Sequence, residues 1–144
     1  MNVVEELKEA FKEMNLKVYY SQEGNFFIVP FKLKTKSGEK EVKIFVEISE
    51  NWILTFGLLE EVDNIPPSMR PHLYEDLLEK TLYGREIKYS LIEIDKEYIA
   101  AQAETRRQAF SREDFKVEFK GVLAAALIFY DEILPKHYSL DKTI

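Results

Sequence analysis

The sequence contains no cysteine and only two histidines among its 144 residues. The lack of cysteine excludes a disulfide scaffold and thiol chemistry, and it leaves too few ligands for a structural zinc site of the usual kind. His72 and His137 lie far apart in the chain, and neither has a serine or aspartate at a spacing typical of a catalytic relay. We therefore expect both histidines at the surface or at its boundary, without a catalytic role.

Glycine and long apolar runs are also scarce. The five glycines nowhere have the spacing of a phosphate-binding loop or a dinucleotide-binding turn, which excludes nucleotide binding by those two motifs but leaves other designs open. The longest apolar run, Val122 to Tyr130, is far shorter than the ~20 residues of a membrane span. Residues Met1 to Glu6 lack the features of a signal peptide. These features predict a cytoplasmic protein without a membrane partner.

Positive charge is in the minority, with 20 lysines and arginines against 26 aspartates and glutamates and a net charge of −6. This balance argues against a polybasic nucleic-acid-binding protein. Arg106, Arg107 and Arg112 surround Phe110, a mixture that can bind nucleic acid, but the net charge favours a protein partner over a phosphate-bearing one. Glutamate and lysine dominate the charged residues, which is a tendency of thermophile proteins.

The spacing of the apolar residues predicts the elements and the fold class. Apolar residues three and four apart predict helices over residues 2–14, 67–83 and from Ser111 to about Leu134, where Pro135 should end the last one. Alternation with period two predicts strands over 16–21, 26–33, 42–48, 52–59, 87–91 and 98–105. Short turns between the strands indicate antiparallel pairing. We predict one α+β domain over residues 1–144, with two layers and an antiparallel sheet flanked by helices in the order α-β-β-β-(β)-α-β-β-α.

The strands carry apolar residues on both faces, which is the most informative feature of the sequence. In a sheet with one solvent-exposed face, apolar and polar residues should alternate more cleanly than they do here. We expect alternate residues of each strand to face the core, and the apolar residues between them form a candidate partner-binding surface. The second set is covered either by the middle helix of the same chain or by another subunit or partner. The expected core set is Val29, Phe31, Ile44, Val46, Leu54 and Phe56, and the expected partner-binding set is Phe26, Ile28, Phe45, Ile53 and Leu59.

Two further groups have a functional and a structural interpretation. Glu60, Glu61 and Asp63 could hold a hard divalent cation, but their spacing fits no EF-hand loop, so a solvated acidic loop is favoured and no metal or cofactor is expected. Tyr89, Tyr98 and Tyr130 could line a pocket between the last helix and the sheet, although core packing is the commoner use of such residues. The last helix should bury Leu123 and Leu127 against the sheet.

At this length, the order of helix, meander, helix, hairpin and helix resembles the type III secretion chaperone-like fold, including the YbjN family. The local features of the resemblance are the helix-to-strand start Asn15-Leu16-Lys17-Val18, the strand start Asn51-Trp52-Ile53-Leu54 after the meander, and the long last helix after a polar strand. The resemblance implies an acidic, homodimeric, non-enzymatic protein that binds other proteins. It also implies a dimer built by the middle helix and an adjoining strand, here about Met69–Tyr83 and Glu86–Ile94.

Together these observations predict a non-enzymatic protein-binding module, chaperone-like or regulatory, that acts as a cytoplasmic homodimer without a cofactor. The alternative is a sensor of a small molecule or nucleotide, with its pocket between the last helix and the sheet. An enzyme is the least favoured class, because no nucleophile, base or metal ligands occur at a recognisable spacing.

Overall fold

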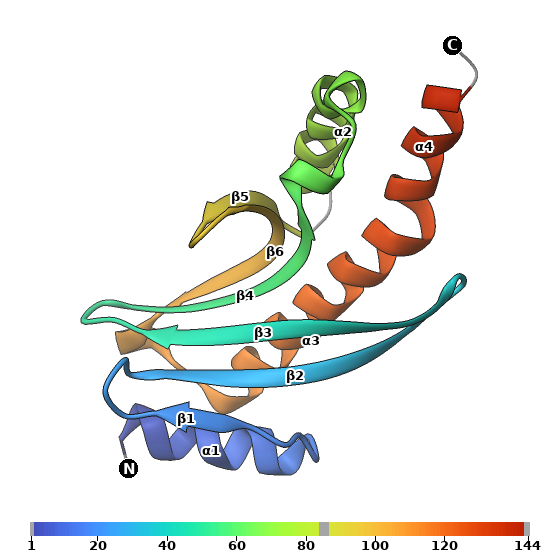
Figure 1. Cartoon of the computed structure of the whole chain (residues 1–144). Helices are drawn as coiled ribbons and strands as arrows, with labels where there is room; N and C mark the ends of the chain where they lie inside the picture. Colours follow the sequence, from blue (N-terminus) through green and yellow to red (C-terminus); the bar gives the residue numbers. More distant parts are fainter. Residues whose placement is uncertain (1, 84–86, 143–144) are drawn as a thin grey trace.

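A computed structural model describes residues 2–83 and 87–142, and Figure 1 shows the arrangement of its elements. The helical elements include a π-helical segment, Phe129–Ile133, between the last two α-helices. Single 3-10 turns occupy Val62–Asn64, Pro67–Met69 and Arg107–Ala109. In chain order the helices and strands are α1 (Val3–Glu13), β1 (Tyr19–Ser21), β2 (Phe26–Thr35), β3 (Gly38–Ile48), β4 (Trp52–Glu61), α2 (Arg70–Tyr83), β5 (Tyr89–Glu93), β6 (Glu97–Arg106), α3 (Arg112–Ile128) and α4 (Leu134–Lys142).

The strands form one six-stranded sheet in the order β1-β2-β3-β4-β6-β5, and all neighbouring pairs are antiparallel. This confirms the predicted α+β class and the predicted order of elements. Residues with positive φ close two of the turns, Asn25 (φ 53°) before β2 and Gly38 (φ 123°) at the start of β3. Such backbone angles suit asparagine and glycine, which is why these turns were visible in the sequence.

One face of the sheet is packed against α1 and α3, which together with the sheet form the two layers (Figure 1). The aromatic ring of Phe11 on α1 lies 5.2 Å from that of Phe27 on β2 and 5.5 Å from that of Phe115 on α3. Helix α2 contacts β5 and α4 and stands beside the end of the sheet (Figure 1). The middle helix therefore does not cover the other face of the central strands.

Helix α1 begins and ends where the sequence predicts. The side chain of Asn2 accepts a hydrogen bond from the Glu5 amide at 2.9 Å, and Asn15 leaves the helix with a φ of 57°. The helix is tied to α3 by Arg112, whose guanidinium contacts Glu6 at 3.0 Å and Glu13 at 2.7 Å. These contacts fix α1 beside α3 over the β1–β2 end of the sheet.

The last helix differs from the prediction in two ways. Pro135 does not end it: α4 begins at Leu134, directly after the π-helical segment Phe129–Ile133, and continues through the proline to Lys142. A proline lacks the amide hydrogen that an α-helix needs, and wider π-type turns are places where the regular hydrogen-bond ladder is already interrupted. Leu123 and Leu127 are only half-buried, at the flank of α3, so their predicted burial was wrong. The residues that face the sheet are Phe115, Phe119, Val122, Ala126 and Phe129.

Candidate functional site

The face of the sheet opposite α1 and α3 carries a continuous set of apolar side chains, which we call the open face. Three of the five predicted partner-binding residues, Phe26, Ile28 and Phe45, lie on it and are half-buried. The ring of Phe45 stacks on that of Phe56 at 5.1 Å and lies 6.3 Å from that of Phe26. The members of the open face are Phe26, Ile28, Phe45, Trp52, Leu54, Phe56 and Leu58.

The other two predicted residues, Ile53 and Leu59, do not belong to the open face. Ile53 is 1% exposed and Leu59 is 7% exposed, both within the core that α3 covers. The predicted inward direction of Trp52, Leu54 and Phe56 was therefore wrong for β4. Ile48 of β3 pairs directly with Ile53, and residues paired across antiparallel strands point to the same face. The core-facing residues of β4 are therefore Ile53, Thr55, Gly57 and Leu59.

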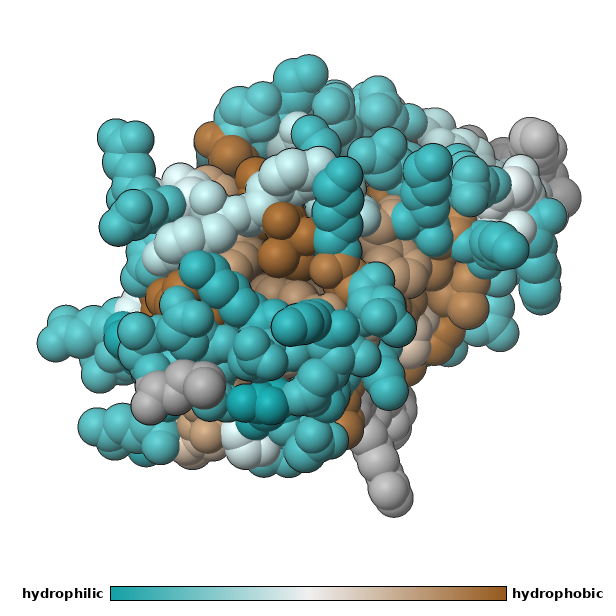
Figure 2. All heavy atoms as spheres, turned by 90° about the horizontal axis from the view of Figure 1, so that it is seen from below, coloured by the Kyte–Doolittle hydropathy of each residue, from teal (hydrophilic) through white to brown (hydrophobic). Residues whose placement is uncertain are grey.

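Charged side chains border the apolar residues of the surface. In the view from below, hydrophobic side chains emerge between hydrophilic ones across the side of the molecule that carries α1 and β1 (Figure 2). On the open face, Glu47 of β3 and Glu104 of β6 lie directly opposite Leu54 of β4, one on each side. Apolar surface bordered by charge is the composition of a protein interface that also keeps the free chain dissolved.

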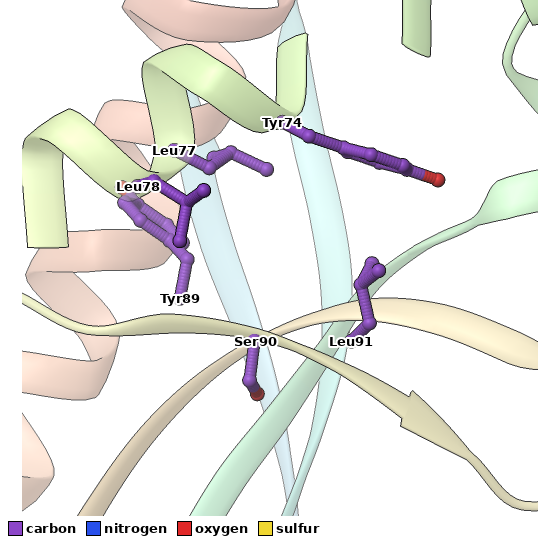
Figure 3. Close-up of a pocket in the computed structure, with 6 residues that line it drawn as sticks. All are labelled: Tyr74, Leu77, Leu78, Tyr89, Ser90 and Leu91. Carbon is purple, nitrogen blue, oxygen red and sulfur yellow. The ribbon is translucent and has the colours of Figure 1, made fainter. Parts of the chain in front are cut away.

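A second apolar surface lies between α2 and β5 and contains a pocket of about 230 Å³, which we call the α2–β5 pocket. Leu77 and Leu78 of α2 and Leu91 of β5 point into the space between the two elements, whereas the Ser90 side chain points away from α2 (Figure 3). Leu78 is 70% exposed at the rim. The lining residues are Tyr74, Leu77, Leu78, Tyr89, Ser90 and Leu91. These elements overlap the two segments for which the resemblance implies a dimer, although residues 84–86 lie outside the described part of the chain.

The tyrosines of the predicted sensor pocket do not meet in one cavity. The Tyr89 hydroxyl donates to the Ala125 carbonyl at 2.6 Å, and the Tyr130 hydroxyl donates to the Leu59 carbonyl at 2.6 Å. Burial raises the pKa of both phenols, so both stay protonated and act as hydrogen-bond donors. Tyr89 thereby joins β5 to α3, and Tyr130 joins the π-helical segment to β4. Tyr98 lies elsewhere, at the β5–β6 hairpin, where its hydroxyl donates to Asp95 at 3.3 Å.

His137 is buried, which the sequence did not predict, whereas His72 is exposed as expected. The Nε2 atom of His137 on α4 lies 2.9 Å from a carboxylate oxygen of Asp76 on α2. Burial acts against ionisation of Asp76, but the hydrogen bond with His137 and the charges of Lys136 and Lys80 outweigh it and lower its pKa. The four side chains hold α2 against α4 and so position the α2–β5 pocket.

The predicted acidic loop is partly neutralised by its neighbours. Glu60 accepts a hydrogen bond from the Asn64 amide at 3.1 Å, and Glu61 lies 3.6 Å from the Lys96 ammonium. Asp63 is exposed on the 3-10 turn that follows β4. Within residues 2–83 and 87–142, no three or more acidic or histidine side chains gather in a way that could hold a metal ion.

Trp52, Leu78 and Leu91 are surface residues that were not predicted from the sequence. Their exposed fractions are 47%, 70% and 47%, which places them among the most exposed large apolar side chains of the described chain. A signal for Leu78 was present, because it follows Leu77 directly and one helical face cannot bury both neighbours. No comparable signal existed for Leu91, whose strand was correctly predicted but whose cover was unknown.

Comparisons with known proteins identify the fold. No protein-family model and no curated protein matches the sequence. Among solved structures, YbjN from E. coli, a proposed transcription regulator, matches with a TM-score of 0.60 and 14% identity over 88% of this chain and 90% of that chain. A chain of the HopA1-SchA chaperone-effector complex matches with a TM-score of 0.54 and 16% identity over 82% and 84%. A chain of the ExsC-ExsE complex matches with a TM-score of 0.61 and 9% identity over 92% and 97%.

These likenesses confirm that the chain has a YbjN-like, secretion-chaperone-like fold, as the sequence predicted. At identities of 9–16% they establish the fold and do not by themselves carry over a partner or a site residue. Among the described residues, no helix has the length and apolar character needed to cross a membrane.

Proposed function

We propose that this chain is a non-enzymatic, cytoplasmic protein-binding module, chaperone-like or regulatory, that acts as a homodimer. The open face is the observation that carries the proposal, because its aromatic row of Phe26, Phe45 and Phe56 has no covering helix from the described part of the chain. Phe26 and Phe45 are half-buried and Phe56 is 5% exposed, and the apolar face continues along β4 to Trp52, which is 47% exposed. A partly exposed apolar surface that extends across several strands marks an interaction surface. The HopA1-SchA chaperone-effector complex, which has the same fold, supports a protein as the partner.

We assign the homodimer contact to the α2–β5 pocket. Leu78 projects from the rim while the pocket itself is a hole lined almost entirely by apolar side chains. A projecting side chain beside a hole suits a two-fold contact, in which each protomer offers the same surface and each residue is used twice. Leu91, which is 47% exposed on the β5 side of the pocket, would be buried in the same contact.

The test of partner binding is affinity capture from the native lysate by the wild type and by Phe45→Asp. Phe45 lies in the middle of the open face, so a carboxylate there should remove retained partners without unfolding the chain, which circular dichroism checks. The matched control is Leu140→Asp, which places the same charge at a 52% exposed apolar position on α4, away from the open face.

We expect the wild type and Leu140→Asp to retain the same proteins and Phe45→Asp to lose them. If a folded Phe45→Asp chain retains every protein that the wild type retains, the open face is not the binding surface. If no protein is retained by any of the three chains above a bead-only background, the proposed function is wrong.

A further inference from the structure

Trp52, the only tryptophan of the chain, stands at the end of the open face where β4 begins. It is 47% exposed, and it forms a wall shared by two adjoining hollows of about 310 and 380 Å³. Glu104 of β6 is the other residue common to both hollows. The backbone beneath is fixed, because the Ser49 hydroxyl and the Trp52 backbone are joined by hydrogen bonds at 3.0 and 3.1 Å.

The side chains around Trp52 are predominantly acidic. Four carboxylates line the two hollows, whereas a single cation, Arg106, does so. Glu118 accepts a hydrogen bond from Thr105, but Glu47 and Glu104 form no ion pair with any residue in the described part of the chain. The four carboxylates belong to Glu47, Glu104, Asp114 and Glu118.

The same hollows have apolar surface between the charges. Leu54 is half-buried and lies in register between Glu47 and Glu104. On the other side of Trp52, Val117 of α3 is 55% exposed. A side chain that enters either hollow therefore meets an indole ring, an aliphatic side chain and at least one carboxylate.

We propose that the Trp52 surface binds a segment of the partner protein that carries arginine or lysine among apolar residues. A cation over an indole ring is attracted by its π-system, and an arginine can at the same time bond the flanking carboxylates. The net charge of −6 steers a basic segment toward this chain and repels phosphate-bearing partners. This inference rests on the proposed function and adds to it the chemistry of the partner.

The experiment uses Trp52 itself as the reporter, since no other tryptophan contributes to the fluorescence. The probes are three synthetic peptides: Gly-Ser-Leu-Arg-Val-Arg-Leu-Ser-Gly, the same peptide with glutamine at both arginine positions, and the same peptide with glutamate there. We expect the arginine peptide to change the emission saturably, the glutamine peptide to bind more weakly, and the glutamate peptide not to bind. Binding of the arginine peptide should weaken as salt is added.

A double variant that removes two negative charges, Glu47→Gln with Glu104→Gln, should weaken binding of the arginine peptide by about three- to tenfold, as expected for two exposed ion pairs. The matched control removes the same charge elsewhere, by Glu9→Gln on α1 with Glu132→Gln on the π-helical segment, and should bind as the wild type does. Circular dichroism and light scattering establish that both variants fold and keep the oligomeric state of the wild type.

Equal affinity for the arginine and glutamine peptides, or no response of Trp52 to any peptide, overturns the assignment of a basic partner. Dissociation of a wild-type dimer by Glu47→Gln with Glu104→Gln also overturns it, because a second copy would then occupy this face. These results are separate from those for the proposed function. If Phe45→Asp still loses the captured partner, the open face binds protein but the partner is not recognised by its positive charge.

Discussion

At the scale of single residues, Ile53 and Phe45 show how two similar side chains on neighbouring strands come to have different roles. Ile53 is 1% exposed beneath α3, whereas Phe45 is half-buried in a row of aromatic rings on the open face. If either residue is replaced by aspartate, the loss of folding stability depends on whether water reaches the new carboxylate. The difference separates a residue that holds the fold together from one that is available to a partner.

We therefore expect Ile53→Asp to destabilise the chain by about 3–5 kcal/mol, or to unfold it, since the charge would be buried without a partner. Phe45→Asp should change the free energy of unfolding far less. Urea denaturation followed by circular dichroism measures both. A folded Ile53→Asp chain with near wild-type stability would show that α3 does not cover this part of the sheet.

In β4 the residues predicted to face the core lie on the open face, and the register of the preceding turn explains this error. Both parities of β4 are apolar, and the true core parity contains Thr55 and Gly57, so alternation alone gave no preference. A turn of three residues would pair Ile48 with Trp52, whereas the turn observed pairs Ile48 with Ile53. A shift of one residue sends every side chain of a strand to the opposite face. The strands themselves were predictable, but the register of this hairpin was not.

At the scale of elements, the contact between α3 and the centre of the sheet depends on Gly57. A Cβ atom added there would lie 3.2 Å from a methyl group of Val42 and 3.6 Å from a methyl group of Val122 on α3. The glycine thus permits a closer approach of helix and sheet than a larger residue would allow. A long amphipathic helix such as α3 can be predicted from its apolar spacing. Its distance from the sheet depends on facing residues such as Gly57 and Val122, which the spacing does not reveal.

Gly57→Val should destabilise the chain by about 1–3 kcal/mol, because α3 or Val42 must move to accept two additional methyl groups. Gly57→Ala should cost less, since one methyl group requires a shift of only a few tenths of an ångström. Chemical denaturation measures both variants. If valine is as well tolerated as alanine, α3 does not approach the sheet as closely as the structure indicates.

The π-helical segment is the element that the sequence could not indicate. Pro135 is a reliable signal that regular α-helical hydrogen bonding stops, and it does stop, over Phe129–Ile133. The chain nevertheless stays helical and continues as α4, where His137 forms a buried pair with Asp76 of α2. This contact joins residues 61 positions apart, so no local pattern could have predicted it.

At the scale of the whole molecule, the described helices leave two apolar surfaces uncovered, one on a face of the sheet and one at the α2–β5 end. The open face has no covering helix among the described elements, and the α2–β5 pocket opens beside an exposed Leu78. We expect other proteins to cover both: a partner on the open face and a second copy of this chain at the pocket. The second claim is the easier to measure, because it needs no knowledge of the partner.

The most direct test is therefore the molar mass in solution, measured by size-exclusion chromatography with light scattering. The wild type and the control variant Tyr19→Asp, on the edge strand β1, should show twice the 17.0 kDa of one chain, whereas Leu78→Asp should show 17.0 kDa with an unchanged circular dichroism spectrum. A carboxylate at this 70% exposed position is harmless in a monomer but costly to bury in an interface. A wild type that remains a 17.0 kDa monomer at tens of micromolar, or a Leu78→Asp chain that remains a dimer, would contradict the account.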